Sequence, residues 1–562
     1  MKHFLPLIYF ILIQFIISAQ PTNKWGDQGN GTFLNPILPA DYSDPDVIRV
    51  GKDYYLIAST FQLSPGNVIM HSKDLVNWQT IGYATPDIAK ITENLNYTKM
   101  NNYSRGFYAA SIRFHNDTFY LHFTTLSEGI FVCKSKKITG PWTTEQMKDM
   151  YGKPLKCSWF DDPCPLWDDD GNAYFVSSKL KSGWIPRLFK MSQNGTQILD
   201  ACNDSLNLGG IRKSLDGTVY CDKKTAEGNK LYKINGIYYF FHNEVTKPEG
   251  YRTAIFHKSK YFYGTKSDGS AGTAQEPGKY DEIKFLRNAL NSDLEPNQGG
   301  LIDTPDGKWY FITHQGKGSP WGRPMSLLPI EWKDGWPKVI KRDTGDVGNL
   351  IWEPIKKPVQ GYTFKAPQGS DNFESSNLGY QWQWNYQPKP NSYSLVEKKG
   401  YLRMYAYKPI QPDTFFKAGN TLCQRYFKSD SVVATVKIDF DKTENGQVFG
   451  LAHFNGGVNY SSLGVVKKSG QSILRYENDK KFYYLDTLSN KTQTIWLQTK
   501  VDSKYKSYFL YSLDGNKFTP IEGIYNLSWG KYRGDYIGIF NYNNETETGY
   551  VDVDWFDYKF SH

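Results

Sequence analysis

The sequence predicts an all-β protein, a five-bladed β-propeller followed by a β-sandwich (jelly-roll) domain. One pattern occurs five times, at intervals of roughly 50–70 residues: an apolar run, a turn rich in Gly, Asp or Asn, and an aromatic-rich run. Tyr, Phe and Trp make up 16% of the 562 residues, and such residues favour strands. After residue 369 other alternating stretches follow without this repeat.

Each repeat predicts a β-hairpin, because alternating runs flank a turn. The five copies begin at Ser43, Ala110, Asp162, Glu227 and Gly299. Propeller blades are four-stranded sheets around a central channel, and the spacing leaves room for two more strands in each copy. Five blades are therefore expected over residues 20–353.

The N-terminus has the pattern of a secretory signal peptide. Lys2 and His3 precede an apolar run over residues 4–17, and small residues lead to a cleavage site after Ala19. Pro6 and Gln14 interrupt the run, which is also short for a transmembrane anchor. We expect residues 1–19 to be removed and the protein to be exported, to the periplasm or the extracellular space.

The net charge of +9 does not indicate a nucleic-acid partner, because the lysines are scattered rather than gathered in a stripe. The six cysteines fit no zinc spacing. Export permits disulfides, and Cys157 and Cys164 are close enough to be tested as a pair, but mostly free, buried thiols are expected. The oligomeric state is left open.

A second domain is predicted after a linker. Residues 354–368 are rich in Pro, Gly and Lys, which is typical of a linker. Residues 431–440, 494–502 and 507–521 alternate as strands of a sandwich do, so the sandwich domain is expected over 369–562.

Three repeats open with a carboxylate, at Asp44, Asp162 and Glu227. If each repeat begins the innermost strand of its blade, these acids occupy nearly equivalent positions and meet at one mouth of the channel. Such a meeting indicates a catalytic site. The alternative is that an Asp before Pro merely starts a strand.

Four segments stand out along the chain: NPILPADYSDPDVIRVGKDYYLIASTF, DDPCPLWDDDGNAYFV, AEGNKLYKINGIYYF and NQGGLIDTPDGKWYF. They resemble glycoside hydrolase family 43, the β-xylosidases, α-L-arabinofuranosidases and arabinanases that act on plant cell-wall polysaccharides. The resemblance implies a five-bladed propeller, and the ending VDVDWFDYKF resembles the last strand of the concanavalin-like sandwich of many members. In those relatives the sandwich packs on the propeller and helps to wall the active site.

The resemblance also implies catalytic roles. It makes Asp44 the general base, Glu227 the general acid, and Asp162 a third carboxylate that orients the acid and keeps it protonated. An inverting glycosidase needs such an acid and base on opposite faces of the sugar. Side chains alternate along a strand, so only one of Asp161 and Asp162 should face the channel. Asp162 is favoured because, like Asp44, it precedes a proline.

Other residues near the repeats are candidates for the sugar pocket. Aromatic residues expected near the channel mouth can stack on a sugar ring, although burial between blades is the alternative; they are Phe61, Phe107, Trp159 and Trp321. Arg323 resembles the substrate-contacting Arg of the family. His314 is expected to project into the channel, where some relatives hold a calcium ion or water, or else to be structural.

No cofactor is expected to be required for catalysis. A structural calcium ion is possible at Asp371, Asp552 and Asp554.

The sequence therefore predicts an exo-acting, inverting hydrolase that releases L-arabinofuranose or D-xylose from plant polysaccharides or oligosaccharides. A catalytically inactive sugar-binding propeller and a fructoside-cleaving hydrolase are the alternatives. Departures from the family pattern, at Ala109-Ala110 and at Asn229, leave the linkage preference open.

Overall fold

The computed structural model describes most of the chain as β-structure. The described residues are 24–155, 160–179, 185–199, 224–246, 251–273, 276, 278–289, 296–315, 318–340, 353–412 and 414–561. The predicted signal peptide and Trp159 lie outside them. Helical structure in these ranges is limited to short 3-10 segments such as Ile88–Lys90, which confirms the all-β fold class. In the same ranges no helix is long and apolar enough to cross a membrane.

In the described part of the N-terminal region, five antiparallel sheets follow one another along the chain, and each opens with one of the predicted hairpins. Their strands are β3 (Asp46–Val50), β4 (Asp53–Ala58), β6 (Gly66–Ser72) and β7 (Gln79–Thr85); β8 (Ser111–His115), β9 (Thr118–Thr125), β10 (Gly129–Ser135) and β11 (Thr143–Gln146); β12 (Phe160–Trp167), β13 (Ala173–Lys179) and β14 (Ile185–Met191); β15 (Lys224–Ile234), β16 (Ile237–Thr246), β17 (Tyr251–Ser259) and β18 (Asp281–Ala289); and β19 (Pro296–Asp303), β20 (Trp309–Gln315), β21 (Met325–Lys333) and β22 (Trp336–Val339).

The first strands of these sheets form a closed ring. β3 contacts β8, β8 contacts β12, β12 contacts β15, β15 contacts β19, and β19 returns to β3. The N-terminal segment closes the ring by backbone bonds to the last sheet, with Ile37 N–H donating to the Met325 carbonyl at 2.7 Å. Each inner strand therefore faces a common central channel, as a propeller requires.

A chain of polar contacts joins the inner strands below the channel mouth. The Arg113 guanidinium on β8 binds Asp46 of β3 at 2.7 Å and the Cys164 sulfur of β12 at 2.9 Å. Cys164 also accepts from the Leu231 N–H of β15 at 3.3 Å. Cys164 is therefore a free thiol, whereas Cys157 lies outside the described residues. This network fixes neighbouring blades relative to one another.

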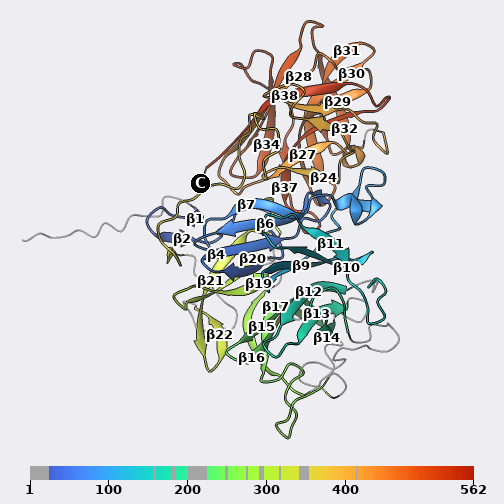
Figure 1. Cartoon of the computed structure of the whole chain (residues 1–562). Coiled ribbons are helices and arrows are strands. Elements are labelled where there is room, and N and C mark those ends of the chain that lie inside the picture. Colours follow the sequence, from blue (N-terminus) through green and yellow to red (C-terminus); the bar gives the residue numbers. More distant parts are fainter. Residues whose placement is uncertain are drawn as a thin grey trace, which may run out of the picture.

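The C-terminal region is a sandwich of two large sheets, orange to red in Figure 1, seated on the propeller. One sheet runs β32 (Lys481–Thr487), β31 (Gln471–Asn478), β30 (Tyr460–Lys468), β29 (Gln447–Asn455), β37 (Asp535–Asn543), β27 (Thr421–Arg425), β24 (Gln383–Asn385) and β5 (Leu63–Ser64). The other runs β25 (Tyr393–Ser394), β26 (Leu402–Tyr405), β38 (Tyr550–Phe560), β28 (Val432–Asp439), β33 (Thr494–Val501), β34 (Lys506–Ser512) and β35 (Thr519–Pro520), with β36 (Tyr525–Asn526) beside β34.

The two regions are joined more closely than a flexible linker would allow. β5 belongs in sequence to the propeller but pairs with β24 of the sandwich. In the predicted linker, β23 (Ile355–Lys356) pairs with β2 (Thr32–Leu34), which in turn pairs with β1 (Gly26–Asp27). Lys357 is buried and binds Asp27 and Asp74 at 2.7 and 2.8 Å. The segment is therefore part of the packed structure.

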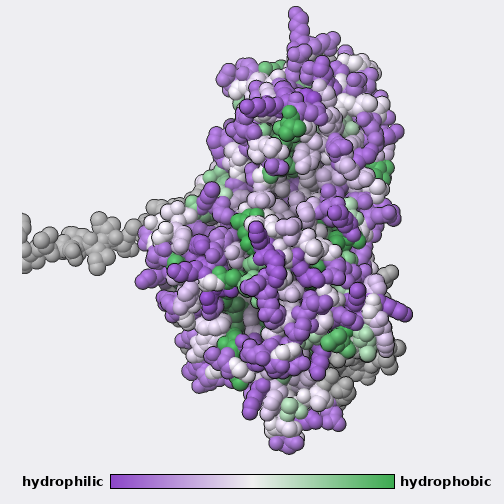
Figure 2. All heavy atoms as spheres, viewed as in Figure 1, coloured by the Kyte–Doolittle hydropathy of each residue, from purple (hydrophilic) through white to green (hydrophobic). Residues whose placement is uncertain are grey.

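The face of the molecule drawn in Figure 2 is largely polar. In the view of Figure 2, hydrophobic residues form small separate patches among hydrophilic ones. The apolar side chains are instead gathered inside, where one buried cluster runs from the first propeller sheet into the sandwich.

Candidate active site

The acidic residues of β12 and β15 lie where these inner strands are interrupted by bulges, and Asp44 lies just before its strand begins. The ladder of β12 shifts register between Asp161 and Cys164, and that of β15 shifts between Glu227 and Lys230. Asp44 lies two residues before β3. A bulge bends the strand and re-aims its side chains, and bulges are frequent beside active sites. The repeated hairpins therefore present carboxylates at one level of the channel.

Asp44 and Asp162 take the same backbone conformation, with φ of 56° and 49°. Aspartate tolerates this left-handed region better than most residues. A proline follows each of them, and its missing N–H is harmless where the ladder is already broken. In β15 the corresponding position is Gly228, with φ of 75°. A Cβ there would lie 2.8 Å from the Asn243 amide, so the position requires glycine.

Glu227 is therefore offset by one residue from the position that Asp44 and Asp162 occupy. Its structural counterpart in β12 is Asp161, because Asp161 pairs with Ser178 as Glu227 pairs with Asn243. The predicted equivalence of the three acids holds to within one residue. The longer glutamate side chain starts from a different backbone position than the two aspartates do.

Asp44 is 5% exposed and held as an oriented carboxylate. Its Oδ2 accepts from the Ser59 hydroxyl at 2.6 Å, and its Oδ1 accepts from Arg323 Nη1 at 3.3 Å. Burial raises the pKa of Asp44, the Arg323 charge and the Ser59 bond lower it, and the Glu227 charge raises it. The contacts from Ser59 and Arg323 favour the ionised form that a general base needs.

His314 supports Asp44 through the backbone. The Asp44 N–H donates to His314 Nδ1 at 2.7 Å, which leaves the proton of a neutral imidazole on Nε2. Burial lowers the pKa of His314 well below its usual value, and the nearby arginines lower it further. Nε2 has no partner among the described residues. A protonated Nε2 and an occupied Nδ1 do not favour the predicted metal ligand, and no group of three or more potential metal-binding side chains occurs in the described ranges.

Asp162 contacts the strand that carries Glu227. Its Oδ2 accepts from the Gly228 N–H at 2.5 Å, and its carbonyl accepts from the Asn229 amide at 3.2 Å. Burial raises the pKa of Asp162 well above its usual value, and the charges of Asp161 and Glu227 raise it further. Asp162 is thus placed to orient the segment around Glu227.

Asp161 also belongs to this group, although the alternation argument assigned the channel to Asp162 alone. Its Oδ1 accepts from the Asp162 N–H at 2.9 Å, so the side chain folds back over the bulge. Burial raises the pKa of Asp161 to about 7, with further contributions from the charges of Glu227 and Asp44. The bulge brings both neighbours to the acidic group, because regular alternation fails there.

Glu227 is the most exposed of the three predicted catalytic acids, with 21% of its side chain accessible, against 7% for Asp44. Arg252 Nη2 on the adjacent β17 lies 3.2 Å from its Oε1. Glu227 is thus more accessible than Asp44 to a bound leaving group.

A buried lysine lies next to the acids. Lys230 is fully buried on β15, and its ammonium donates to the Asn229 carbonyl at 3.2 Å. Its charge lowers the pKa of both Asp44 and Asp162, so it opposes the effect of burial on these acids. Lys230 was not among the residues predicted from sequence. The available signal was a lysine three residues after Glu227, although Lys224 and Lys233 lie on the same strand.

Aromatic rings from both domains line the space above the acids. Phe61 meets Tyr108 edge-on at 5.8 Å and stacks on Tyr532 of the sandwich at 6.4 Å. Burial raises the pKa of Tyr108, and the charge of Asp161 raises it further, which places this phenol close to the acidic group. The Tyr532 side chain remains half exposed. Phe61 itself is 2% exposed, so it lies behind Tyr108 and Tyr532, and its contact with a sugar stays a prediction.

Two of the predicted aromatic contacts lie elsewhere. Phe107 is fully buried and stacks on Phe123 at 4.9 Å inside the blade core, so the next residue, Tyr108, is the one beside the site. Trp321 meets Tyr505 of the sandwich at 4.8 Å, and the Lys428 ammonium lies 4.8 Å from its ring centre. Trp321 therefore packs in the contact between the domains.

The sandwich contributes to the site through the loop between β36 and β37. The Arg323 guanidinium lies 5.3 Å from the ring centre of Trp529 and 5.4 Å from that of Tyr532. These cation–π contacts hold the arginine that binds Asp44. Trp529 and Tyr532 were missed from the sequence, because more than 200 residues separate them from the arginine.

The acids considered for calcium have other partners. Asp552 binds Arg403 through both oxygens at 2.8 and 3.1 Å, and Asp554 binds Lys437 at 2.6 Å. Asp371 accepts from the Trp382 indole at 2.8 Å. Oxygens engaged with cationic and indole N–H donors do not form the oxygen cage that calcium needs, so these contacts do not favour that prediction.

Comparisons with known proteins agree with this arrangement. Residues 33–337 match the model of glycosyl hydrolases family 43, and residues 370–559 match the beta xylosidase C-terminal concanavalin A-like domain. The chain is 31% identical to a beta-xylosidase of Formosa agariphila, over 97% of this chain and 93% of that protein. It is 27% identical to the non-reducing end alpha-L-arabinofuranosidase BoGH43B of Bacteroides ovatus, over 94% and 95%.

Solved structures share the fold. A bifunctional GH43-CE protein of Bacteroides eggerthii superimposes with a TM-score of 0.76 and 26% identity, over 94% of this chain and 64% of that one. A mutant of the GH43 protein BlXynB of Bacillus licheniformis, at 24% identity, superimposes with a TM-score of 0.76 over 94% of this chain and 100% of that one. The chain belongs to glycosyl hydrolase family 43 and is a glycosidase with a propeller and a concanavalin-like sandwich.

Proposed function

We propose that the protein is an exo-acting, inverting hydrolase that releases L-arabinofuranose or D-xylose from plant cell-wall polysaccharides such as xylan, arabinan or arabinoxylan. The observation that carries the proposal is that Asp44 and Glu227 differ in burial and in their partners. Asp44 is buried and receives bonds from Ser59 and Arg323, whereas Glu227 is more exposed and faces Arg252. The names of the relatives support both sugars.

In this mechanism Asp44 takes a proton from a water molecule, which attacks the anomeric carbon. Glu227 gives its proton to the glycosidic oxygen as the bond to the sugar breaks. Asp162 holds the Gly228 backbone beside Glu227, and an ionised Asp162 would repel negative charge on it. Arg323 orients Asp44, and the half-exposed Tyr532 ring, supported from behind by Phe61, forms an apolar wall for the sugar.

The reaction is tested by two measurements. Release of nitrophenol from the α-L-arabinofuranoside and the β-D-xyloside identifies the sugar. Proton NMR of the first sugar formed should show the anomer opposite to that of the substrate, because a water molecule attacks directly. Retention of configuration would contradict the assignment, since it requires a covalent intermediate.

Export is part of the proposal. The charged, apolar and small-residue regions of residues 1–19 support a cleaved signal peptide. Mass spectrometry of the exported protein should find Gln20 at the N-terminus, whereas an intact Met1 in the cell interior would contradict it.

A further inference from the structure

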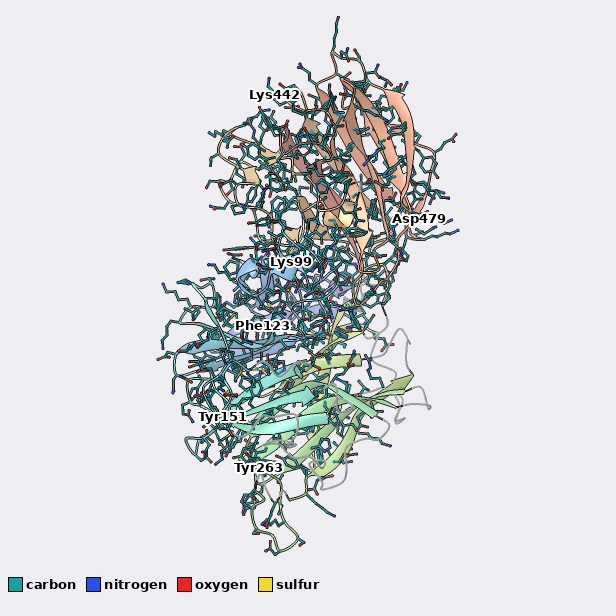
Figure 3. All side chains as sticks on the ribbon, turned by 90° about the vertical axis from the view of Figure 1, so that its right-hand side faces the viewer. Lys99, Phe123, Tyr151, Tyr263, Lys442 and Asp479 are labelled. Carbon is teal, nitrogen blue, oxygen red and sulfur yellow. The ribbon has the colours of Figure 1, made fainter. Side chains whose placement is uncertain are left out.

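A large groove lies between the outer part of the propeller and the sandwich. It has a volume of about 1910 Å³. Its walls come from the region around β7, from the turn before β11, from residues 370–393 and from the end of β38. The loop that contributes Asn96 and Tyr97 to the lining continues to Lys99, which Figure 3 shows at the junction of the two domains. None of the catalytic acids or their direct partners lines it.

The walls of the groove are rich in aromatic side chains. Nine of the 34 lining residues are Tyr, Trp or Phe, against 16% for the whole chain. Six of them are Tyr83, Trp142, Tyr380, Trp384, Tyr393 and Trp555. Tyr380 is 53% exposed and Tyr393 is 36% exposed, so ring surface is available to a ligand. Exposed aromatic surface gathered in one concave place marks a binding site more often than scattered exposure does.

The charged groups of the groove already have partners. Lys559 binds Asp557 at 2.6 Å, and Lys389 binds Glu547 at 2.7 Å. Asp371 accepts from the Trp382 indole at 2.8 Å. Asp87, the remaining charged residue of the lining, accepts from the Ala89 N–H that begins a 3-10 segment. A ligand that suits paired charges and exposed rings is uncharged and has both apolar faces and hydroxyl groups.

The floor of the groove is held in place before any ligand binds. Gln387 Oε1 accepts from the Ser64 hydroxyl at 2.6 Å and from the Ile88 N–H at 3.1 Å, which ties the sandwich segment to the propeller. Prolines at 86, 141, 388 and 390 also line the groove and stiffen its rim. A pre-organised site loses less conformational entropy on binding.

From these features we infer that the groove is a second, non-catalytic binding site for a segment of uncharged polysaccharide. Its volume exceeds the roughly 300–1,000 Å³ of a typical small-molecule pocket, so it has room for several sugar rings rather than one. Aromatic faces stack on the C–H faces of sugars, and the amides of Asn372, Asn377 and Asn391 lie among the polar groups that could meet hydroxyls. The choice of arabinoxylan as the test polysaccharide rests on the proposed function.

The test is affinity electrophoresis of the full-length protein in native gels that contain soluble neutral arabinoxylan. The variant is Tyr380→Ala/Tyr393→Ala, because both rings are exposed and the Tyr83 hydroxyl donates to the Tyr380 backbone carbonyl, which the change retains. The matched control is Tyr151→Ala, a 74% exposed tyrosine of the propeller outside the groove, labelled in Figure 3. Excess xylose and arabinose in every gel suppress binding at the catalytic site.

We expect the wild type and Tyr151→Ala to be retarded equally and the double variant to bind roughly tenfold more weakly. Its kcat/KM on nitrophenyl glycosides should be unchanged, which also shows that it is folded. Equal retardation of all three proteins, or stronger retardation by acidic polygalacturonate than by arabinoxylan, would overturn the inference. So would a dimer in sedimentation that the double variant abolishes, because a second copy of the chain would then occupy the groove.

The binding test of the groove and the hydrolysis test of the proposed function can fail independently of each other. Gel mobility does not depend on hydrolysis, so a groove that binds arabinoxylan in a protein inactive on both nitrophenyl glycosides would refute only the proposed function. A protein that hydrolyses them but is not retarded would refute only the groove.

Discussion

Both domains bury carboxylates, but they do so differently. In the sandwich, Asp535 is fully buried and binds His453 at 2.6 Å and the Tyr525 hydroxyl at 3.2 Å. Burial raises the pKa of Asp535, and both partners lower it. In the propeller, burial also raises the pKa of Asp161 and Asp162, but there neighbouring acids add to the effect. Burial is common to both places, and only mutual repulsion distinguishes the propeller.

This difference separates a structural acid from a catalytic one. Asp535 has donors of its own and no acidic neighbour among the groups that shift its pKa, whereas Asp44 has donors and also feels the charge of Glu227. Carboxylates that perturb one another's pKa titrate as a coupled group, and such groups are typical of sites for general acid–base catalysis. A shifted pKa by itself therefore does not identify an active site, whereas a group of acids that perturb one another does.

The largest contrast is expected between Asp162→Asn and Asp535→Asn. Asp162→Asn should lower kcat about 100-fold, because general acid–base assistance at Glu227 is lost. It should also change the basic limb of the pH–rate profile, because Asp162, whose pKa is raised by burial and by the charges of Asp161 and Glu227, no longer titrates beside the acid. The measurement is kcat and kcat/KM between pH 4 and 9. An unchanged profile with only weaker substrate binding would make Asp162 a simple contact residue.

Asp535→Asn is the matched control. It should leave kcat unchanged and lower the free energy of unfolding by about 1–3 kcal/mol, because His453 loses its charged partner. Thermal unfolding followed by circular dichroism measures this. If Asp535→Asn changed the pH–rate profile of the folded enzyme, the distinction between the two kinds of buried acid would fail.

A smaller effect is expected for Lys230→Met. Lys230 lowers the pKa of Asp44, so its loss should raise that pKa and make the base ionise only at higher pH. The acidic limb of the kcat/KM profile should move to higher pH. Below that limb, kcat/KM should fall roughly tenfold for each pH unit by which the limb moves. Lys230→Arg keeps the charge and should retain the original limb if the larger side chain is accommodated. A Met variant with an unmoved acidic limb would give Lys230 a packing role only.

The smallest effect is expected for Tyr532→Ala. The ring stacks on Phe61 and lies 5.4 Å from the Arg323 guanidinium, so it belongs to the binding wall and not to the reacting groups. KM for oligosaccharides should rise roughly three- to tenfold while kcat changes little. Tyr484→Ala, a 55% exposed tyrosine of the sandwich, is the control. Equal KM values for both variants would mean that the sandwich does not contribute to substrate binding.

The repeats were sufficient to predict the hairpins, because turn and strand patterns are local properties of the sequence. They also predicted that Asp44 and Asp162 are equivalent, since both precede a proline at the same point of the hairpin. The bulge at Glu227 and Gly228 was not predictable, because a one-residue shift depends on packing against Asn243 and Gln298. Which of Phe107 and Tyr108 faces the site also depends on packing, so Phe107 was predicted from the sequence although Tyr108 lies beside the site.

Contacts between segments distant in the sequence also could not be predicted from it. Nothing in residues 529–532 indicates that their rings hold Arg323, and nothing in the Lys-rich linker indicates that Lys357 is buried against two aspartates. Both depend on how the sandwich and the propeller pack together. Likewise, the alternation rule excluded Asp161, because the rule does not hold within a bulge.

The central claim is that Glu227 is the general acid and Asp44 the general base, and leaving-group dependence tests it directly. A nitrophenolate leaves readily without a proton, whereas the alkoxide of a sugar does not. Glu227→Gln should therefore lose far more kcat/KM on xylo- or arabino-oligosaccharides than on nitrophenyl glycosides. Asp44→Asn should impair both substrates alike, because both need activated water. If Asp44→Asn instead shows the dependence on leaving group, or if both variants stay fully active, the assignment is contradicted.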